Sequence, residues 1–91
     1  EDLRLVGTYR DTEGFTQSNP GIEARAYVNG DGMAIVATRT QEGKAVKGAI
    51  EVPGYRFAEA STLGNAQVSS DGREVTLGQY DLAVLVYKKT K

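Results

Sequence analysis

The carboxylates are the side chains of this sequence best able to do chemistry, because two paired acids can cleave glycosidic or peptide bonds without a histidine. Asp31 and Asp71 each adjoin a glycine in turn-like segments, where aspartate commonly serves the backbone. Four glutamates alternate with apolar residues and so fall on the polar faces of predicted strands: Glu23, Glu51, Glu59 and Glu74. We therefore expect no catalytic residue in this chain.

Asp81 needs a separate explanation, because it interrupts an apolar run directly after Tyr80. A functional carboxylate is one interpretation of this position. The other is an acid at the entrance of a strand that accepts hydrogen bonds from a neighbouring turn or an arginine. We favour the structural role.

The segment Asn29-Gly-Asp-Gly32 resembles the start of a calcium-binding loop, in which oxygen ligands alternate along the chain. The pattern fails further on, since Met33 takes the next ligand position and Thr40 stands where a bidentate glutamate is required. Asn-Gly and Asp-Gly both suit tight hairpin turns. The segment therefore predicts a hairpin and no metal site.

Aromatic rings are the remaining candidates for binding, because sugars and bases can stack on their faces. Tyr27 is expected to face solvent beside Arg25, and these two with Tyr55 are the candidate ligand contacts. A tyrosine on an exposed strand face more often packs across strands, and the chain has no tryptophan. Carbohydrate binding is therefore the second interpretation of this chain.

The composition excludes several classes of function. The sequence has no cysteine and no histidine, which removes disulfides, thiol catalysis, the Ser-His-Asp relay and the usual nitrogen ligand of transition metals. Eleven basic and twelve acidic residues give a net charge of -1, which disfavours a nucleic-acid partner. The apolar run from Leu82 to Tyr87 is too short to span a bilayer. We expect a monomeric domain without cofactor, nucleic acid or membrane partner.

Apolar residues recur with a period of two along most of the chain, which indicates β-strands. Strands are predicted from Leu3 to Tyr9, on both sides of the Asn29–Gly32 turn, and at short intervals to the end, while Phe15 is expected to anchor the polar connection between residues 10 and 21. Pro53-Gly54 suits a corner between two sheets better than a tight hairpin. The predicted fold is all-β, a two-layer antiparallel sandwich of seven to nine short strands in a single domain over residues 1–91.

The final strand, predicted at Tyr80–Tyr87, is apolar at almost every position, so we expect both of its faces to be buried. If one face proves open, the strand lies at a sheet edge or that face docks on a partner. The predicted core is the following set: Leu5, Ile22, Ala24, Ala26, Val28, Ile35, Val46, Ile50, Val52, Phe57, Val75, Leu77, Leu82, Val84 and Val86.

Two stretches carry a resemblance to a known kind of domain. The hairpin from Ala26 to Ala37, and Val75-Thr-Leu77 followed after a short break by Tyr80–Tyr87, resemble the C-terminal β-sandwich that follows the (β/α)8 barrel in many bacterial glycoside hydrolases. In those enzymes the catalytic carboxylates lie in the barrel, so the resemblance places no catalytic residue on this chain.

The resemblance implies a non-catalytic accessory domain of a larger carbohydrate-active enzyme, which packs against and stabilises its catalytic barrel. The partner is then the catalytic domain of the same polypeptide, and the compartment is extracytoplasmic. Because the chain begins at Glu1 rather than methionine, we expect a fragment from the C-terminal end of a longer protein. The alternative is a small β-sandwich module that binds carbohydrate or protein.

Overall fold

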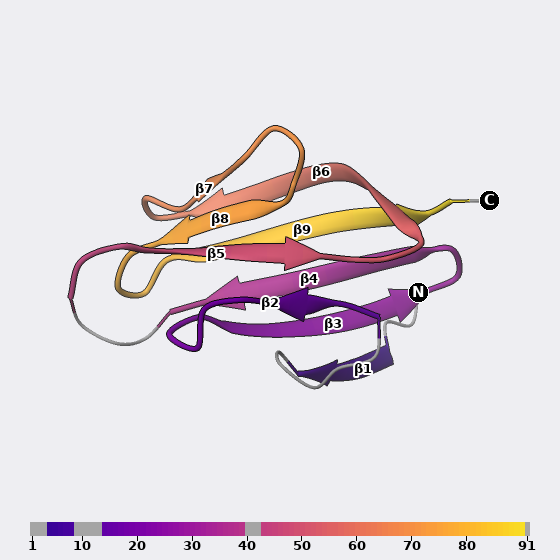
Figure 1. The fold of residues 1–91 in the computed structure, drawn as a ribbon, viewed down its shortest axis with the longest axis horizontal. Helices are drawn as coiled ribbons and strands as arrows, with labels where there is room; N and C mark the ends of the chain where they lie inside the picture. Colours follow the sequence, from indigo (N-terminus) through magenta and orange to yellow (C-terminus); the bar gives the residue numbers. More distant parts are fainter. Residues whose placement is uncertain (1–3, 9–13, 40–42, 91) are drawn as a thin grey trace.

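The computed structural model describes residues 4–8, 14–39 and 43–90, with the backbone alone for residues 4–8 and 29. Within these ranges the chain forms nine strands and no helix (Figure 1). The strands make two antiparallel sheets, one of five strands and one of four, which pack face to face. The predicted fold class, an all-β antiparallel sandwich, is confirmed.

The larger sheet has the strand order β1-β3-β4-β9-β6. Its strands are β1 (Arg4–Thr8), β3 (Glu23–Asn29), β4 (Gly32–Thr38), β9 (Leu82–Lys89) and β6 (Tyr55–Leu63). The strands β4 and β9, which carry apolar residues on both faces, are neighbours in the interior of this sheet. The last strand begins and ends two residues later than predicted. Leu3 and Tyr9, the predicted ends of the first strand, lie outside the described residues.

The smaller sheet has the order β2-β5-β8-β7 and covers one face of the larger one. Its strands are β2 (Thr16–Gln17), β5 (Val46–Glu51), β8 (Glu74–Leu77) and β7 (Gln67–Val68). The two-residue strand β2 falls in a segment predicted as an irregular connection. It is held by the side chain of Gln17, whose amide nitrogen donates to the carbonyls of Asn19 and Ile22 at 2.8 and 3.0 Å.

The hairpin between β3 and β4 forms where the sequence predicts it. Asn29 pairs with Gly32, which leaves Gly30 and Asp31 as a two-residue loop. Gly30 has a φ of 62°, and glycine accepts this left-handed geometry without steric cost. Asp31 is exposed in that loop, as expected of a turn residue.

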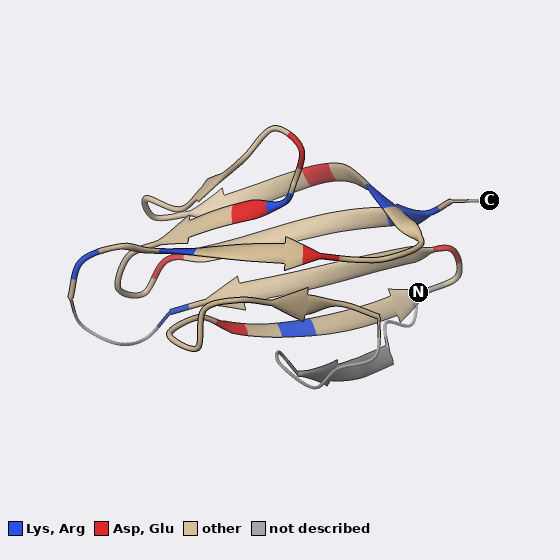
Figure 2. Cartoon of the chain, in the orientation of Figure 1, with Lys and Arg blue, Asp and Glu red and all other residues tan. Residues whose placement is uncertain are grey.

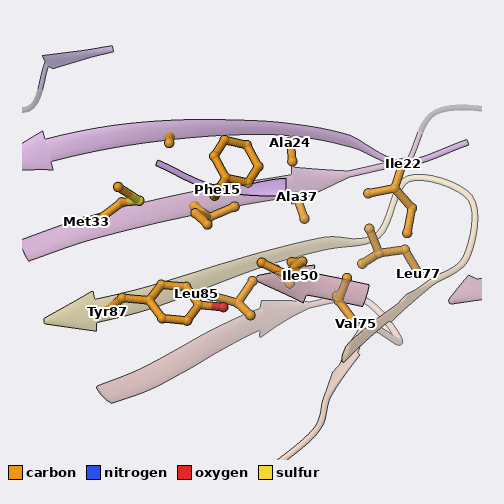
Figure 3. Close-up of a cluster of buried hydrophobic side chains, with 13 residues drawn as sticks. Phe15, Ile22, Ala24, Met33, Ala37, Ile50, Val75, Leu77, Leu85 and Tyr87 are labelled. Carbon is orange, nitrogen blue, oxygen red and sulfur yellow. The ribbon is translucent and has the colours of Figure 1, made fainter. Parts of the chain in front are cut away.

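The core lies between the two sheets (Figure 3). Predicted core members that are fully buried include Ile22, Ile35, Ile50 and Leu77, and Phe15 is also buried and anchors the segment before β2. Full burial of such a side chain stabilises the fold by roughly 1.5–3 kcal/mol. Four other predicted members are only partly buried against this cluster: Val28, Val46, Val52 and Phe57. Leu5 was also predicted to be a core residue, but only its backbone is among the described parts of the chain.

The prediction that both faces of β9 are buried was correct for the face with Ala83 and Leu85 and wrong for the other face. Leu82, Val84 and Val86 do not join the core but are half-buried on the opposite face, whereas Ala83 and Leu85 are fully buried. Tyr87 is also buried at 4% exposure and was not predicted. Alternation forces this outcome, because residues two apart share a face and Tyr87 and Leu85 point toward the smaller sheet.

Candidate functional site

A cleft of about 580 Å³ opens between the two sheets where the chain crosses from β5 to β6. Its walls are residues 50–57 and 71–73, together with the side chain of Tyr87. Clefts that hold small ligands have volumes of roughly 300–1,000 Å³. The size of this one is therefore sufficient for a small ligand.

One wall is the corner at Pro53-Gly54, which carries the chain from the smaller to the larger sheet as predicted. The backbone N–H of Tyr55 donates to the carbonyl of Val52 at 3.1 Å, and Gly54 has a φ of 84°. These features are typical of a type II turn, in which proline occupies the first central position and glycine, with a positive φ, occupies the second. The carbonyl of Gly54 also accepts hydrogen bonds from the amide and the hydroxyl of Thr90, at 2.8 and 2.9 Å. The start of β6, with Tyr55, is thereby fixed beside the cleft.

The opposite wall is the turn between β7 and β8. The hydroxyl of Ser69 donates to Oδ1 of Asp71 at 2.7 Å, and the backbone N–H of Arg73 donates to the same oxygen at 3.0 Å. Hydrogen bonds to the ionised form lower the pKa of the Asp71 carboxyl below its ordinary value of 3.8, with the Ser69 hydroxyl as the main cause. Asp71 is therefore a carboxylate acceptor at neutral pH.

Tyr87 and Phe57 form the inner wall, where the cleft meets the core. The two rings contact edge to face, with centroids 5.7 Å apart and an interplanar angle of 63°. The hydroxyl of Tyr87 donates to the carbonyl of Gly72 at 2.7 Å. Burial, with a smaller contribution from the Asp71 charge, raises the pKa of Tyr87 well above its ordinary value, so this hydroxyl stays a neutral donor. The hydrogen bond ties the β7–β8 turn to the larger sheet.

Charges of both signs line the cleft. Two acidic residues, Glu51 and Asp71, and two basic residues, Arg56 and Arg73, are among the residues that line it, and all four are exposed. Acidic and basic segments are likewise interspersed over the described part of both sheets (Figure 2). The cleft therefore presents hydrogen-bond donors and acceptors without a net charge from these side chains.

The structure separates the three residues predicted as ligand contacts. Tyr55 lines the cleft, on the side of β6 that carries Phe57. Tyr27 and Arg25 lie on β3 opposite Ala34 and Val36, on the outer face of the larger sheet. Tyr27 and Arg25 thus do not share a site with Tyr55.

Asp81 has the structural role that the sequence favoured. It is 7% exposed, and its two carboxylate oxygens accept hydrogen bonds from the backbone N–H groups of Gly78 at 2.7 Å and Asn65 at 3.0 Å. Tyr80, just before it, takes a φ of 64° and exposes its side chain. Asp81 thus fixes the loop that leads into β9.

The outer face of the larger sheet is the second surface of interest. Five apolar side chains of its two central strands lie half-buried there, and we call them the outer ladder: Ala34, Val36, Leu82, Val84 and Val86. They are neighbours by register, with Val36 opposite Val84 and Ala34 opposite Val86. Leu63 on β6, opposite Leu82, extends the apolar surface and is 66% exposed. This half-buried apolar strip distinguishes the outer face of the larger sheet from the polar face that a solvated sheet usually shows.

A titration tests the geometry at Asp71. We expect the Asp71 carboxyl to titrate below 3.8, and Ser69→Ala to bring its pKa closer to that value because the main stabilising hydrogen bond is lost. A pKa lowered in the folded state gives stability that is present above the unfolded pKa and is lost as the pH falls through the folded pKa. Carbon-detected NMR of the side-chain carboxyl measures this, with Ser70→Ala as the matched control. A wild-type pKa at or above 3.8 would contradict the described turn.

In the described ranges, no three carboxylates gather closely enough to hold a metal ion. No helix among the described residues is long and apolar enough to cross a membrane.

Comparisons of the chain with protein-family models, with curated proteins and with solved structures gave no match. What is established is therefore an antiparallel two-sheet sandwich, and the resemblance to glycoside hydrolase domains rests on the sequence motifs alone.

Proposed function

We propose that this chain is a non-catalytic accessory domain of a larger carbohydrate-active enzyme, in which it packs against the catalytic domain of the same polypeptide. The observation that carries the proposal is the outer ladder. A strand pair at the centre of a sheet normally shows polar residues on a solvated face, but β4 and β9 place valine, leucine and alanine there.

Covering this face is energetically favourable. Each square ångström of apolar surface removed from water contributes roughly 25 cal/mol, so a domain seated on the outer ladder gains from desolvation alone. The ladder is also pre-formed, because both strands are held by the sheet on either side. Docking therefore needs no ordering of the backbone at this surface.

The margins of the ladder favour another protein domain as the occupant. Exposed side chains of both signs flank it, with Glu23 and Arg25 on β3 and Glu59 on β6. An apolar centre with a polar rim is the usual anatomy of a protein interface. The resemblance of the hairpin and of the last strand to C-terminal glycoside hydrolase domains supports a (β/α)8 barrel as the partner.

The coding sequence that precedes Glu1 gives the first test. We expect it to encode a (β/α)8 barrel with paired carboxylates, and we expect no glycosidase activity from the 91-residue chain alone. Turnover of a glycoside by the purified chain, or a preceding sequence without a catalytic domain, would refute the proposal.

Substitution in the full polypeptide tests the docking face. Val84→Arg should lower the melting temperature of the catalytic domain and increase hydroxyl-radical labelling of Val86 and Leu63, because a charge in the ladder disrupts the interface. Thr76→Arg is the matched control, since Thr76 is half-buried on the outer face of the smaller sheet. Equal effects of the two substitutions would mean that the outer ladder is not the interface.

A further inference from the structure

We infer that the cleft between the Pro53-Gly54 corner and the β7–β8 turn binds a neutral saccharide, with the ring of Tyr55 as the stacking surface. This goes beyond the proposed function, because a domain that only docks through its outer ladder has no need of a ligand site. The cleft opens between the sheets and the ladder lies on the outer face, so the two surfaces can be occupied at the same time.

The aromatic lining of the cleft suits a sugar ring. Tyr55 and Phe57 are half-buried, so each is fixed by packing and still presents surface to the cleft. The C–H groups on one face of a pyranose pack well against the negative face of an aromatic ring. Stacking of this kind contributes to affinity without requiring a charge on the ligand.

The polar lining supplies the complementary contacts. A sugar hydroxyl both donates and accepts, and the lining of the cleft includes an acid and a base from the β7–β8 turn, Asp71 and Arg73, with Glu51 and Arg56 beside them. Two acids and two bases cancel, so an anion such as phosphate gains no net attraction from these side chains. The balance of charges therefore favours a neutral ligand over an ion.

The walls of the cleft are held in place before any ligand arrives. Tyr55 follows a type II turn whose Gly54 carbonyl is bonded twice to Thr90, and Asp71 is fixed by Ser69. The hydrogen bond from the Tyr87 hydroxyl to the Gly72 carbonyl fixes the distance between the two walls. A site ordered in advance loses less conformational entropy on binding.

Chemical-shift titration of the ¹⁵N-labelled chain tests the inference. The probes are maltotetraose, cellotetraose, xylotetraose and mannotetraose, each raised to about 10 mM, which detects dissociation constants near 1 mM. At least one of them should shift the amides of residues 50–57 and 71–73. Tyr55→Ala should weaken that binding at least about tenfold, which is the loss of one modest contact.

The matched control is Tyr27→Ala, since Tyr27 is a half-buried tyrosine on the outer face of the larger sheet and should leave binding unchanged. Arg73→Gln provides a second variant if Tyr55→Ala fails to give a dispersed spectrum. The inference is overturned if none of the four oligosaccharides shifts the cleft amides, or if inorganic phosphate binds there more tightly than all of them. Shifts around Tyr27 instead would also overturn it. Val84 lies on the outer face of the larger sheet, away from the cleft, so Val84→Arg should leave saccharide binding unchanged. A failure of the docking proposal can therefore be told apart from a failure of this inference.

Discussion

Leu85→Ala should lower the free energy of unfolding by about 2–5 kcal/mol, the range for truncating a fully buried leucine. Leu85 has no exposed surface and lies at the centre of the larger sheet, opposite Ile35 on β4 and Ala60 on β6. Both flanking strands fix its backbone, so the cavity can collapse only partly. Urea unfolding followed by circular dichroism measures the loss.

The adjacent residue is the control for this prediction. Val84→Ala should lower the free energy of unfolding by only about 1 kcal/mol, because the Val84 side chain is half-exposed in the outer ladder. The two substitutions thus report which face of β9 is covered in the chain alone. Equal losses would show that the ladder is buried by something other than the two described sheets.

Gly72→Ala should cost about 2–4 kcal/mol of folding free energy, the sum of backbone strain and steric overlap. Gly72 has a φ of 70°, and a Cβ atom there would overlap the ring of Phe57 and lie 2.8 Å from the Phe57 Cβ. Phe57 cannot retreat easily, because its ring packs against Tyr87. Thermal or urea unfolding of the variant measures the effect.

Gly54→Ala separates the two contributions. Gly54 also has a left-handed φ, of 84°, but a Cβ atom there meets nothing within 4 Å. Its substitution should therefore cost only the strain, about 1–2 kcal/mol. If Gly72→Ala costs no more than Gly54→Ala, the close approach of the β7–β8 turn to Phe57 is wrong.

Most of the fold could be predicted because its local signals agree with one another. Alternation from Ile22 to Val28, followed by Asn-Gly-Asp-Gly, specifies both strands of a hairpin and its turn. Pro53-Gly54 predicted the crossing between sheets for a physical reason, since a type II turn does not match the twist of a tight hairpin.

The orientation of β9 could not be predicted from its own residues. The stretch from Leu82 to Tyr87 is apolar at every position, so it shows no alternation of polar and apolar residues that would distinguish the core face from the outer face. The decisive residue is Tyr87, whose hydroxyl needs a buried acceptor and finds it in Gly72, a partner fixed by tertiary structure.

The candidate site was predicted only in part, for a similar reason. Tyr55 was chosen for its ring, but nothing in the sequence shows that the turn at Asp71 and Arg73 lies across the cleft from it. Tyr27 and Arg25 were grouped with Tyr55 as candidate ligand contacts. In the structure Tyr27 and Arg25 face outward from β3, whereas Tyr55, at the start of β6, faces the cleft. Contacts between distant turns depend on strand order, which periodicity does not specify.

The position of β9 also determines the order in which the fold can be completed. β9 pairs with β4 on one side and β6 on the other, and it follows every other strand along the chain. During synthesis the β3–β4 hairpin and β6 therefore wait with unpaired edges until residues 82–89 leave the ribosome. Pairings between segments so distant in sequence form slowly, and unpaired strands are prone to aggregate. A nascent chain that stalls before Leu82 is consequently expected to keep its larger sheet in two separate parts, with the β4 edge unpaired.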